Sequence, residues 1–241
     1  MTELCVTVVS HRGLVRGSNQ DRIVVGPWIL GPERDETVVV RIDALDGLVA
    51  VIDGMGGHAA GDLAAMVAAE SVASFGQVTG DVDQLAGVVQ AANRAIYDRM
   101  ERLAEAVGMG VALACVAIVD GELVVVNVGD VRAFVINDGY LIQLTVDDTA
   151  PGGALTASLG GRAHFEAVEP HVLREPAGAM RVLLASDGLT GAVDVETLEG
   201  LVDGDDRGTV ARMLEAALAA GAPDNVSIAL LRAVRQGDFH E

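Results

Sequence analysis

Runs of apolar residues separated by polar turns predict short β-strands in the first part of the chain. Four such runs are predicted as strands: residues 2–9, 22–26, 37–42 and 48–52. Asp46-Gly47 lies between the last two runs, and this residue pair is typical of a tight hairpin turn. The segment Gly31–Glu36 contains no such run, and we expect it to form an exposed loop.

A helical pattern follows these strands. The segment His58–Phe75 is rich in Ala, and Gly76 after it is a typical C-terminal cap. From Asp81 to Val107, apolar residues recur three and four positions apart, which places them on one face of a helix. Asp81 and Gln84 resemble a capping box at the start of this second helix.

The rest of the chain returns to strands and contains two more helices. We expect a β-meander of four strands at Gly110–Val119, Leu123–Val128, Val131–Ile136 and Tyr140–Leu144. Asp138-Gly139 is predicted as the turn between the last two. Further strands are predicted at Phe165–Leu173, Met180–Ala185 and Val226–Val234, and helices at Asp194–Val202 and Asp206–Ala220.

This order of elements does not alternate strand and helix, which argues against a doubly wound parallel sheet. We expect an α+β fold in which two antiparallel sheets form a sandwich with helices on the outside. No internal repeat and no linker rich in Pro or Ser divides the chain. We therefore expect one domain over residues 1–236 and a short C-terminal tail at 237–241.

Composition narrows the class of protein. The 241 residues are 51% hydrophobic but only 3% aromatic, so the core must consist of aliphatic side chains. No stretch approaches about 20 uninterrupted apolar residues, and the N-terminus has no basic region followed by an apolar run, which argues against a membrane span and a signal peptide. Cys5 and Cys115 lie in apolar segments and are predicted to be buried thiols, so we expect a cytoplasmic protein.

The charge excludes some partners. The formal net charge is −19, and all 16 basic residues are Arg. Such a surface repels nucleic acid and anionic lipid, because their binding depends on attraction between cations and phosphate. It also repels a phosphorylated substrate, so any phosphate chemistry needs a local positive centre, which bound cations would supply.

Several aspartates lie where a predicted strand gives way to a turn. A lone Asp-Gly pair is a turn far more often than a metal ligand, as we expect for Asp46-Gly47 and Asp138-Gly139. If the strands next to Asp53, Asp187 and Asp224 lie together, however, three carboxylates converge and repel one another. Mg²⁺ or Mn²⁺ would relieve this repulsion, since both ions prefer carboxylate, carbonyl and water ligands.

These segments together resemble the bacterial form of the PPM (type 2C) family of metal-dependent serine/threonine protein phosphatases. The blocks that carry the resemblance are His11–Asp21, Asp53–His58 (DGMGGH), Gly108–Leu113 (GMGVAL), Val128–Phe134 (VGDVRAF), Ser186–Leu189 (SDGL) and Asp224–Ser227. They occur in family order over nearly the whole chain. The resemblance implies a four-layer α-β-β-α sandwich.

The resemblance also implies roles for individual residues. Asp53 would bridge two Mn²⁺ or Mg²⁺ ions, Asp187 and Asp224 would complete the first ion, and the Gly54 carbonyl would serve the second. Asp21 would hold waters bound to the metals, and Gln20 could accept from such a water. Arg16 would bind the substrate phosphate, because a guanidinium suits bidentate recognition of phosphate oxygens.

The implied activity is hydrolysis of phosphoserine or phosphothreonine in proteins, by direct attack of a water that the two ions share. Two other functions stay open. One is a pseudophosphatase, a module of the same fold that binds phosphoproteins without turnover, although all three carboxylates are retained. The other is a phosphatase of small phosphorylated metabolites. The sequence does not decide the oligomeric state; a monomer is favoured.

Several positions depart from the family pattern. Gln20 stands where many relatives have Glu, which removes a charge near the second ion. His58 is a candidate general acid, since histidine titrates near neutrality, but a capping or packing role is the alternative. A third ion, found in many bacterial relatives, stays open because the nearest carboxylate before the GMG block is Glu105.

Two further departures concern the middle of the chain. We expect Asp130 and Arg132 to form a structural ion pair or a turn lock, not a ligand set. Relatives usually carry a flap of some tens of residues after Asp147-Asp148-Thr149. Here Ala150–Ala154 is too short for a flap subdomain, so we expect the flap to be missing or very short and the site to be open.

Overall fold

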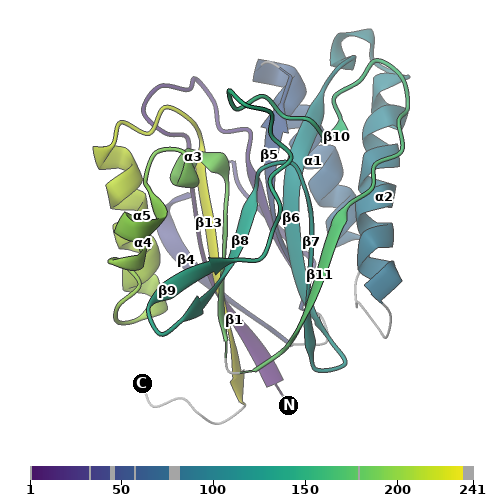
Figure 1. The fold of residues 1–241 in the computed structure, drawn as a ribbon. Coiled ribbons are helices and arrows are strands. Elements are labelled where there is room, and N and C mark those ends of the chain that lie inside the picture. Colours follow the sequence, from purple (N-terminus) through teal and green to yellow (C-terminus); the bar gives the residue numbers. More distant parts are fainter. Residues whose placement is uncertain are drawn as a thin grey trace.

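Two antiparallel sheets pack face to face and helices cover their outer surfaces (Figure 1). The computed structural model describes residues 2–32, 34–43, 47–56, 58–75, 82–178 and 180–235. The expected α+β sandwich with its four layers is therefore confirmed.

The first sheet contains both ends of the described chain. Its strand order is β4 (Arg34–Asp43), β1 (Thr2–His11), β13 (Val226–Arg235), β12 (Arg181–Ala185), β8 (Arg132–Asn137) and β9 (Tyr140–Gln143). The second sheet has the order β11 (His171–Pro176), β7 (Glu122–Val128), β6 (Gly110–Val119), β5 (Val49–Met55), β2 (Arg22–Val25) and β3 (Trp28–Leu30), and β10 (Leu159–Gly160) also pairs with β6.

Helices on both sides explain why the central strands are apolar throughout. On β5, Val49 and Val51 face the other sheet, whereas Ala50 and Ile52 face the helices, and all four are fully buried. A strand that is covered on both faces has no solvent-facing position to fill with a polar residue. The result is the continuous apolar run in the sequence, ending at Asp53.

The helices are divided between the two sheets. Helices α1 (His58–Ala73) and α2 (Val82–Met100) cover the second sheet, and α3 (Asp187–Thr190), α4 (Val195–Glu199) and α5 (Asp206–Ala219) cover the first. Among the described helices, none is both long and apolar enough to cross a membrane. The Asp194 and Asp205 carboxylates cap α4 and α5, accepting from Thr197 N and Gly208 N, each at 2.8 Å.

Two expected pairings of strands are wrong. The runs at 37–42 and 48–52 are strands, but β4 pairs with β1 in one sheet and β5 pairs with β2 and β6 in the other. The expected meander is likewise divided, because the chain crosses between sheets after β7. The β8–β9 hairpin is confirmed, and Asp138 and Gly139 at its turn have φ of 49° and 85°.

Some predicted boundaries also differ. The second helix ends at Met100, and a 3₁₀ turn, η2 (Ala104–Ala106), follows where the prediction continued the helix to Val107. The strand predicted from Phe165 begins only at His171, and Arg34 already belongs to a strand. The sequence pattern missed β3 and α3. The cap at Gly76, the capping box at Asp81, the turn residue Asp46 and the tail at 237–241 lie outside the described residues.

Candidate functional site

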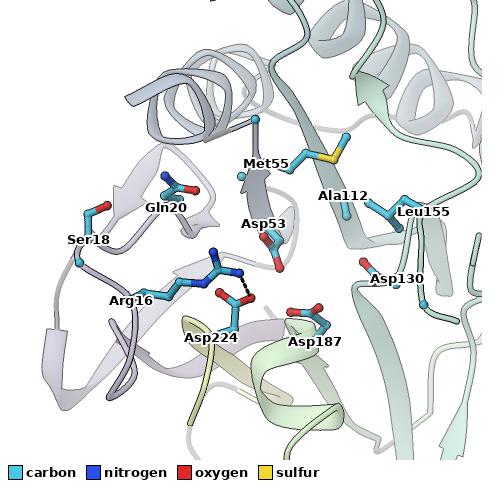
Figure 2. Close-up of a pocket in the computed structure, with 14 residues that line it drawn as sticks. Arg16, Ser18, Gln20, Asp53, Met55, Ala112, Asp130, Leu155, Asp187 and Asp224 are labelled. Carbon is cyan, nitrogen blue, oxygen red and sulfur yellow. Dashed lines mark hydrogen bonds and ion pairs between the residues drawn. The ribbon is translucent and has the colours of Figure 1, made fainter. Parts of the chain in front are cut away.

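A pocket of about 310 Å³ opens at one end of the sandwich, where both sheets contribute side chains (Figure 2). Its lining includes nearly all the site residues predicted from the sequence: Arg16, Gln20, Asp53, Gly54, Asp187 and Asp224. Figure 2 shows the carboxylates of Asp53, Asp187 and Asp224 directed toward the same space. The predicted convergence of three distant aspartates is therefore present in the fold.

Strand pairing produces this convergence. Strand β12 ends where β13 begins, because the two strands are antiparallel neighbours with Ala185 paired to Ile228. Asp187 follows the end of β12 and Asp224 precedes β13, so both lie at the same end of the first sheet. Asp53 lies near the end of β5 in the opposing sheet, paired with Ala112 of β6.

Burial and mutual repulsion disfavour the charged forms of these carboxylates. Burial raises the pKa of Asp53 well above its usual range, and the charges of Asp21, Asp187 and Asp224 raise it further. Burial, and then the charge of Asp224, also raises the pKa of Asp187. Cations in this pocket would stabilise the ionised carboxylates, which is the electrostatic arrangement expected of a metal centre.

Asp21 lies behind the pocket and is 0% exposed. Burial raises the pKa of Asp21 to about 7, and the nearby hydroxyls of Ser227 and Ser186 offset only part of that rise. Neither carboxylate oxygen of Asp21 has a hydrogen-bond partner among the described residues; the Ser186 hydroxyl donates to Asn225 O, and the Ser227 hydroxyl pairs with that of Ser10. A buried carboxylate without partners suits water molecules that connect it to bound ions.

The carboxylates face one pocket but do not form a compact set of metal ligands. Among the described residues, no three His, Cys, Asp or Glu side chains lie close enough together to hold one metal as they stand. Asp224 is engaged elsewhere: Arg16 Nη2 donates to its Oδ2 at 2.5 Å (Figure 2). Asp187 Oδ1 is buried and has no hydrogen-bond partner in the part of the chain that the structure describes. The donor set still fits Mg²⁺ or Mn²⁺, provided that Asp224 turns away from Arg16.

Gly54 occupies a position that no other residue can fill. A Cβ there would lie 2.3 Å from Gly61 O and 2.8 Å from Gln20 O. The backbone of β5 therefore approaches the first turn of α1 and the Gln20 segment closely. A Cβ on Gly61 would lie 2.6 Å from Gln20 Oε1, so the Gln20 side chain packs against α1 beside Gly54.

Asn225 fixes the loop that carries Arg16. Its Nδ2 donates to Arg12 O at 2.8 Å and to Ser18 O at 3.0 Å, and its Oδ1 accepts from Gln20 N at 2.8 Å. The side chain of Arg16 is 54% exposed at the pocket mouth, and its bond to Asp224 raises its pKa. The loop is thus held at both sides of Arg16 while the guanidinium stays accessible.

Sequence reasoning missed two of these contributions. The role of Asn225 as a clamp was not predicted, although an amide that both donates and accepts directly after Asp224 is a usable signal. Asp130 lines the pocket, and burial followed by the charge of Asp187 raises its pKa to about 6. The expected ion pair between Asp130 and Arg132 is not found among the described residues: Arg132 instead binds Asp147 through two nitrogens, at 2.9 and 2.7 Å.

Three other predicted features have different outcomes. Glu105 does not line the pocket, so nothing in the described structure supports a third ion near the GMG block. The side chain of His58 lies outside the described residues. The short segment expected in place of a flap forms a turn closed by a bridge between Thr149 and Leu155, and Gly153 and Leu155 line the pocket.

Comparisons with known proteins agree with this geometry. The family model for protein phosphatase 2C matches residues 31–232. The serine/threonine protein phosphatase PstP of Mycobacterium tuberculosis is 34% identical over 239 residues, which cover 91% of this chain and 43% of PstP. A putative protein phosphatase 2C-type of Streptococcus pyogenes is 28% identical over 82% of this chain and 91% of its own length.

The solved structures include the catalytic domain of PstP in complex with two manganese ions. It superposes with a TM-score of 0.80 at 32% identity and covers 98% of this chain and 100% of that chain. The chain described here thus spans less than half of full-length PstP but the whole of its catalytic domain.

Proposed function

Because the chain belongs to the protein phosphatase 2C family, we propose that it is a metal-dependent protein-serine/threonine phosphatase. The observation that carries the proposal is the pocket itself, in which Asp53, Asp187 and Asp224 converge beside an accessible Arg16. The manganese ions in the related PstP structure give additional support. Fold alone would not be sufficient, since one fold can serve several functions.

The residues have separable roles in this proposal. Asp53, with Asp187 and Asp224 on one side and the Gly54 carbonyl on the other, would hold two Mn²⁺ or Mg²⁺ ions. When bound, the ions supply a water of lowered pKa and positive charge for the phosphoryl oxygens. Asp21 and Gln20 would orient water molecules bound to the ions. Asp21 lies behind the ligands and Gln20 lies beside Gly54, and both offer oxygen atoms that accept hydrogen bonds from water.

Arg16 would bind the phosphate of the substrate. Its guanidinium can offer two parallel N–H donors to phosphoryl oxygens, which fixes the phosphorus in line for attack. Binding of ions would draw Asp224 away from Arg16 and leave these donors for the substrate. The same donors would also stabilise the charge of the transition state.

The two alternative functions differ from this proposal in measurable ways. A pseudophosphatase would bind phosphoproteins without turnover, whereas a metabolite phosphatase would hydrolyse sugar phosphates and ignore phosphopeptides. The short turn at 149–155 supports a site that has no flap subdomain and relies on other surfaces for substrate selection. If so, grafting a relative's flap into this turn changes peptide preference; an unchanged preference contradicts the idea.

The cytoplasmic location and the monomeric state remain parts of the proposal.

One assay tests the proposed function. Hydrolysis of a phosphothreonine peptide is measured with and without Mn²⁺ for wild type and for Asp187→Asn. We expect activity that depends on metal and falls by about 10³-fold in the variant, because losing an ionised ligand removes several kcal/mol of transition-state stabilisation. Equal rates in the two proteins, or full activity in excess chelator, would refute the mechanism.

A further inference from the structure

A second cleft adjoins the candidate active site. Its volume is about 600 Å³, larger than the catalytic pocket, and Met55 and Leu155 line both. Figure 2 shows Met55 at the end of β5, on the side of the pocket where Leu155 lies, and because both residues line both cavities they mark the border between them. The cleft lies between this border and the segment 156–169, which runs beside α2 (Figure 1).

The wall of the cleft is held in place by specific contacts, although residues 161–170 form neither helix nor strand. Asn93 of α2 donates through Nδ2 to Glu166 O at 2.9 Å and accepts from Gly160 N at 2.8 Å. Tyr97 donates to Gly160 O at 3.2 Å, and Gln90 donates to Val168 O. Because the wall is fixed before any ligand arrives, little ordering entropy is lost when a ligand binds.

Aromatic contacts add to this attachment. The rings of Tyr97 and Phe165 meet edge to face with centroids 5.2 Å apart, and the guanidinium of Arg94 lies 4.4 Å from the Phe165 ring centroid. These contacts anchor Phe165 on α2 through Tyr97 and Arg94. The segment that forms the wall is therefore held in a defined position on α2.

The lining of the cleft combines an apolar base with an acidic rim. Leu155, Ala157 and Val168 are partly buried against the cores, and they offer aliphatic surface. At the rim, Glu166 and Glu169 are exposed, and Arg162, the one guanidinium among the described lining residues, lies 3.5 Å from Glu166. The lining therefore carries more negative than positive charge, which favours an aliphatic side chain with a basic neighbour.

We propose that this cleft binds substrate residues near the phosphorylated serine or threonine of a protein. An aliphatic side chain would lie on the apolar base, and a basic neighbour would lie at the acidic rim. The inference rests on the proposed phosphatase function. An extended peptide advances about 3.3 Å per residue, so a residue a few positions from the phosphate reaches a cavity that shares its border with the catalytic pocket. The cleft thus supplies the substrate selection that the short 149–155 turn does not.

Ala167 allows a direct test because it lines the cleft and is exposed, so a large side chain there can fill the cleft without entering the core. Ala163, exposed in the same segment but outside the lining, is the matched control. The values of kcat/KM are measured with Mn²⁺ for p-nitrophenyl phosphate and for two phosphothreonine peptides, one with a Leu-Arg flank and one with a Gly-Asp flank.

For wild type we expect the Leu-Arg peptide to be preferred by about tenfold or more, the usual worth of one apolar subsite. Ala167→Trp removes that preference and leaves p-nitrophenyl phosphate within about twofold of wild type, whereas Ala163→Trp changes neither. The double variant Glu166→Gln/Glu169→Gln reduces the preference for Arg and provides a second reading if the Trp variant misfolds.

Three results would overturn the proposal. One is equal kcat/KM for the two peptides in wild type, and another is an unchanged preference in Ala167→Trp. Hydrolysis of p-nitrophenyl phosphate or sugar phosphates without hydrolysis of either peptide would also overturn it, while leaving a phosphatase. Loss of the phosphatase function itself would be recognised differently, as no hydrolysis of any of these substrates with Mn²⁺.

Discussion

Arg16 connects the two halves of the proposed site, because it contacts a predicted metal ligand and faces the space for a phosphate. Its bond to Asp224 is the one contact drawn between the pocket residues in Figure 2. An arginine cannot give up its charge, so it either neutralises Asp224 or binds a phosphoryl group, but a cation can take its place beside the carboxylate. Metal and substrate binding are therefore expected to support each other.

This arrangement predicts that one substitution weakens catalysis without weakening metal binding. In Arg16→Ala, kcat/KM for a phosphopeptide falls by about 10²-fold, because two charged hydrogen bonds to phosphate are lost. Mn²⁺ affinity, measured by calorimetry, is not weakened, since Asp224 no longer has a competing partner. Arg12→Ala, in the same loop, is the control and leaves both quantities near wild type. Weaker Mn²⁺ binding in Arg16→Ala would contradict this role.

At the residue scale, the carboxylates of the site could be predicted but their neighbours could not. Asp53 and Asp187 each follow an apolar run, which marks the end of a strand in the sequence itself. Asp130 follows Gly129 as a turn residue would, yet it lines the pocket, and its neighbour Arg132 pairs with Asp147, 15 residues further along the chain. Local patterns in a sequence do not reveal which distant residues will form an ion pair.

At the scale of elements, local patterns predicted strands better than their partners. Residues 37–42 and 48–52 have the alternation and turn residues of a hairpin, yet β4 and β5 lie in different sheets. In a sandwich, a short connection can cross between sheets as readily as it can return along one, and both leave the same hydrophobic pattern. Short elements such as β3 and α3 are missed because they contain too few residues to show a period.

Helix α5 offers a prediction at this scale. The Asp205 carboxylate accepts from Gly208 N, and this hydrogen bond lowers its pKa. A lowered folded-state pKa means that the stabilisation is present above the unfolded value and is lost as pH falls through the folded value. We therefore expect Asp205→Ala to lower the thermal midpoint at pH 7, and this difference from wild type to shrink below about pH 4.

Glu215, exposed on α5, is the matched control for this measurement. Its replacement by Ala removes one carboxylate from the same helix without removing a cap. The thermal midpoint of Glu215→Ala is expected to stay close to wild type at both pH values. A pH-independent loss in Asp205→Ala would show that the carboxylate does not act as a charged cap.

At the scale of the whole molecule, both sheets are covered on both faces, so the strands in the middle can be reached only by unfolding. Cys115 of β6 is fully buried between the second sheet and its helices, and burial raises its pKa to about 12. Cys5, on β1, is partly exposed. Labelling of Cys5 therefore requires little or no unfolding, whereas labelling of Cys115 requires unfolding of the second sheet.

This difference predicts how the thiols react. In a Cys5→Ser background, Cys115 is expected to react with a thiol reagent only at the rate of global unfolding, because the neutral buried thiol is neither accessible nor nucleophilic. The measurement is the labelling rate at several urea concentrations, compared with unfolding followed by circular dichroism. Rapid labelling under native conditions would contradict the packing of the second sheet against α1 and α2.

The most direct test of the central claim is a crystal structure of this chain grown with Mn²⁺, with anomalous data collected near the manganese edge. We predict two anomalous peaks in the pocket, both within ligand distance of Asp53, with Asp224 turned from Arg16 toward one of them. In Asp53→Asn crystals grown in the same way, at least one peak is lost. The absence of any peak near Asp53 in the wild-type crystal would contradict the proposed metal centre.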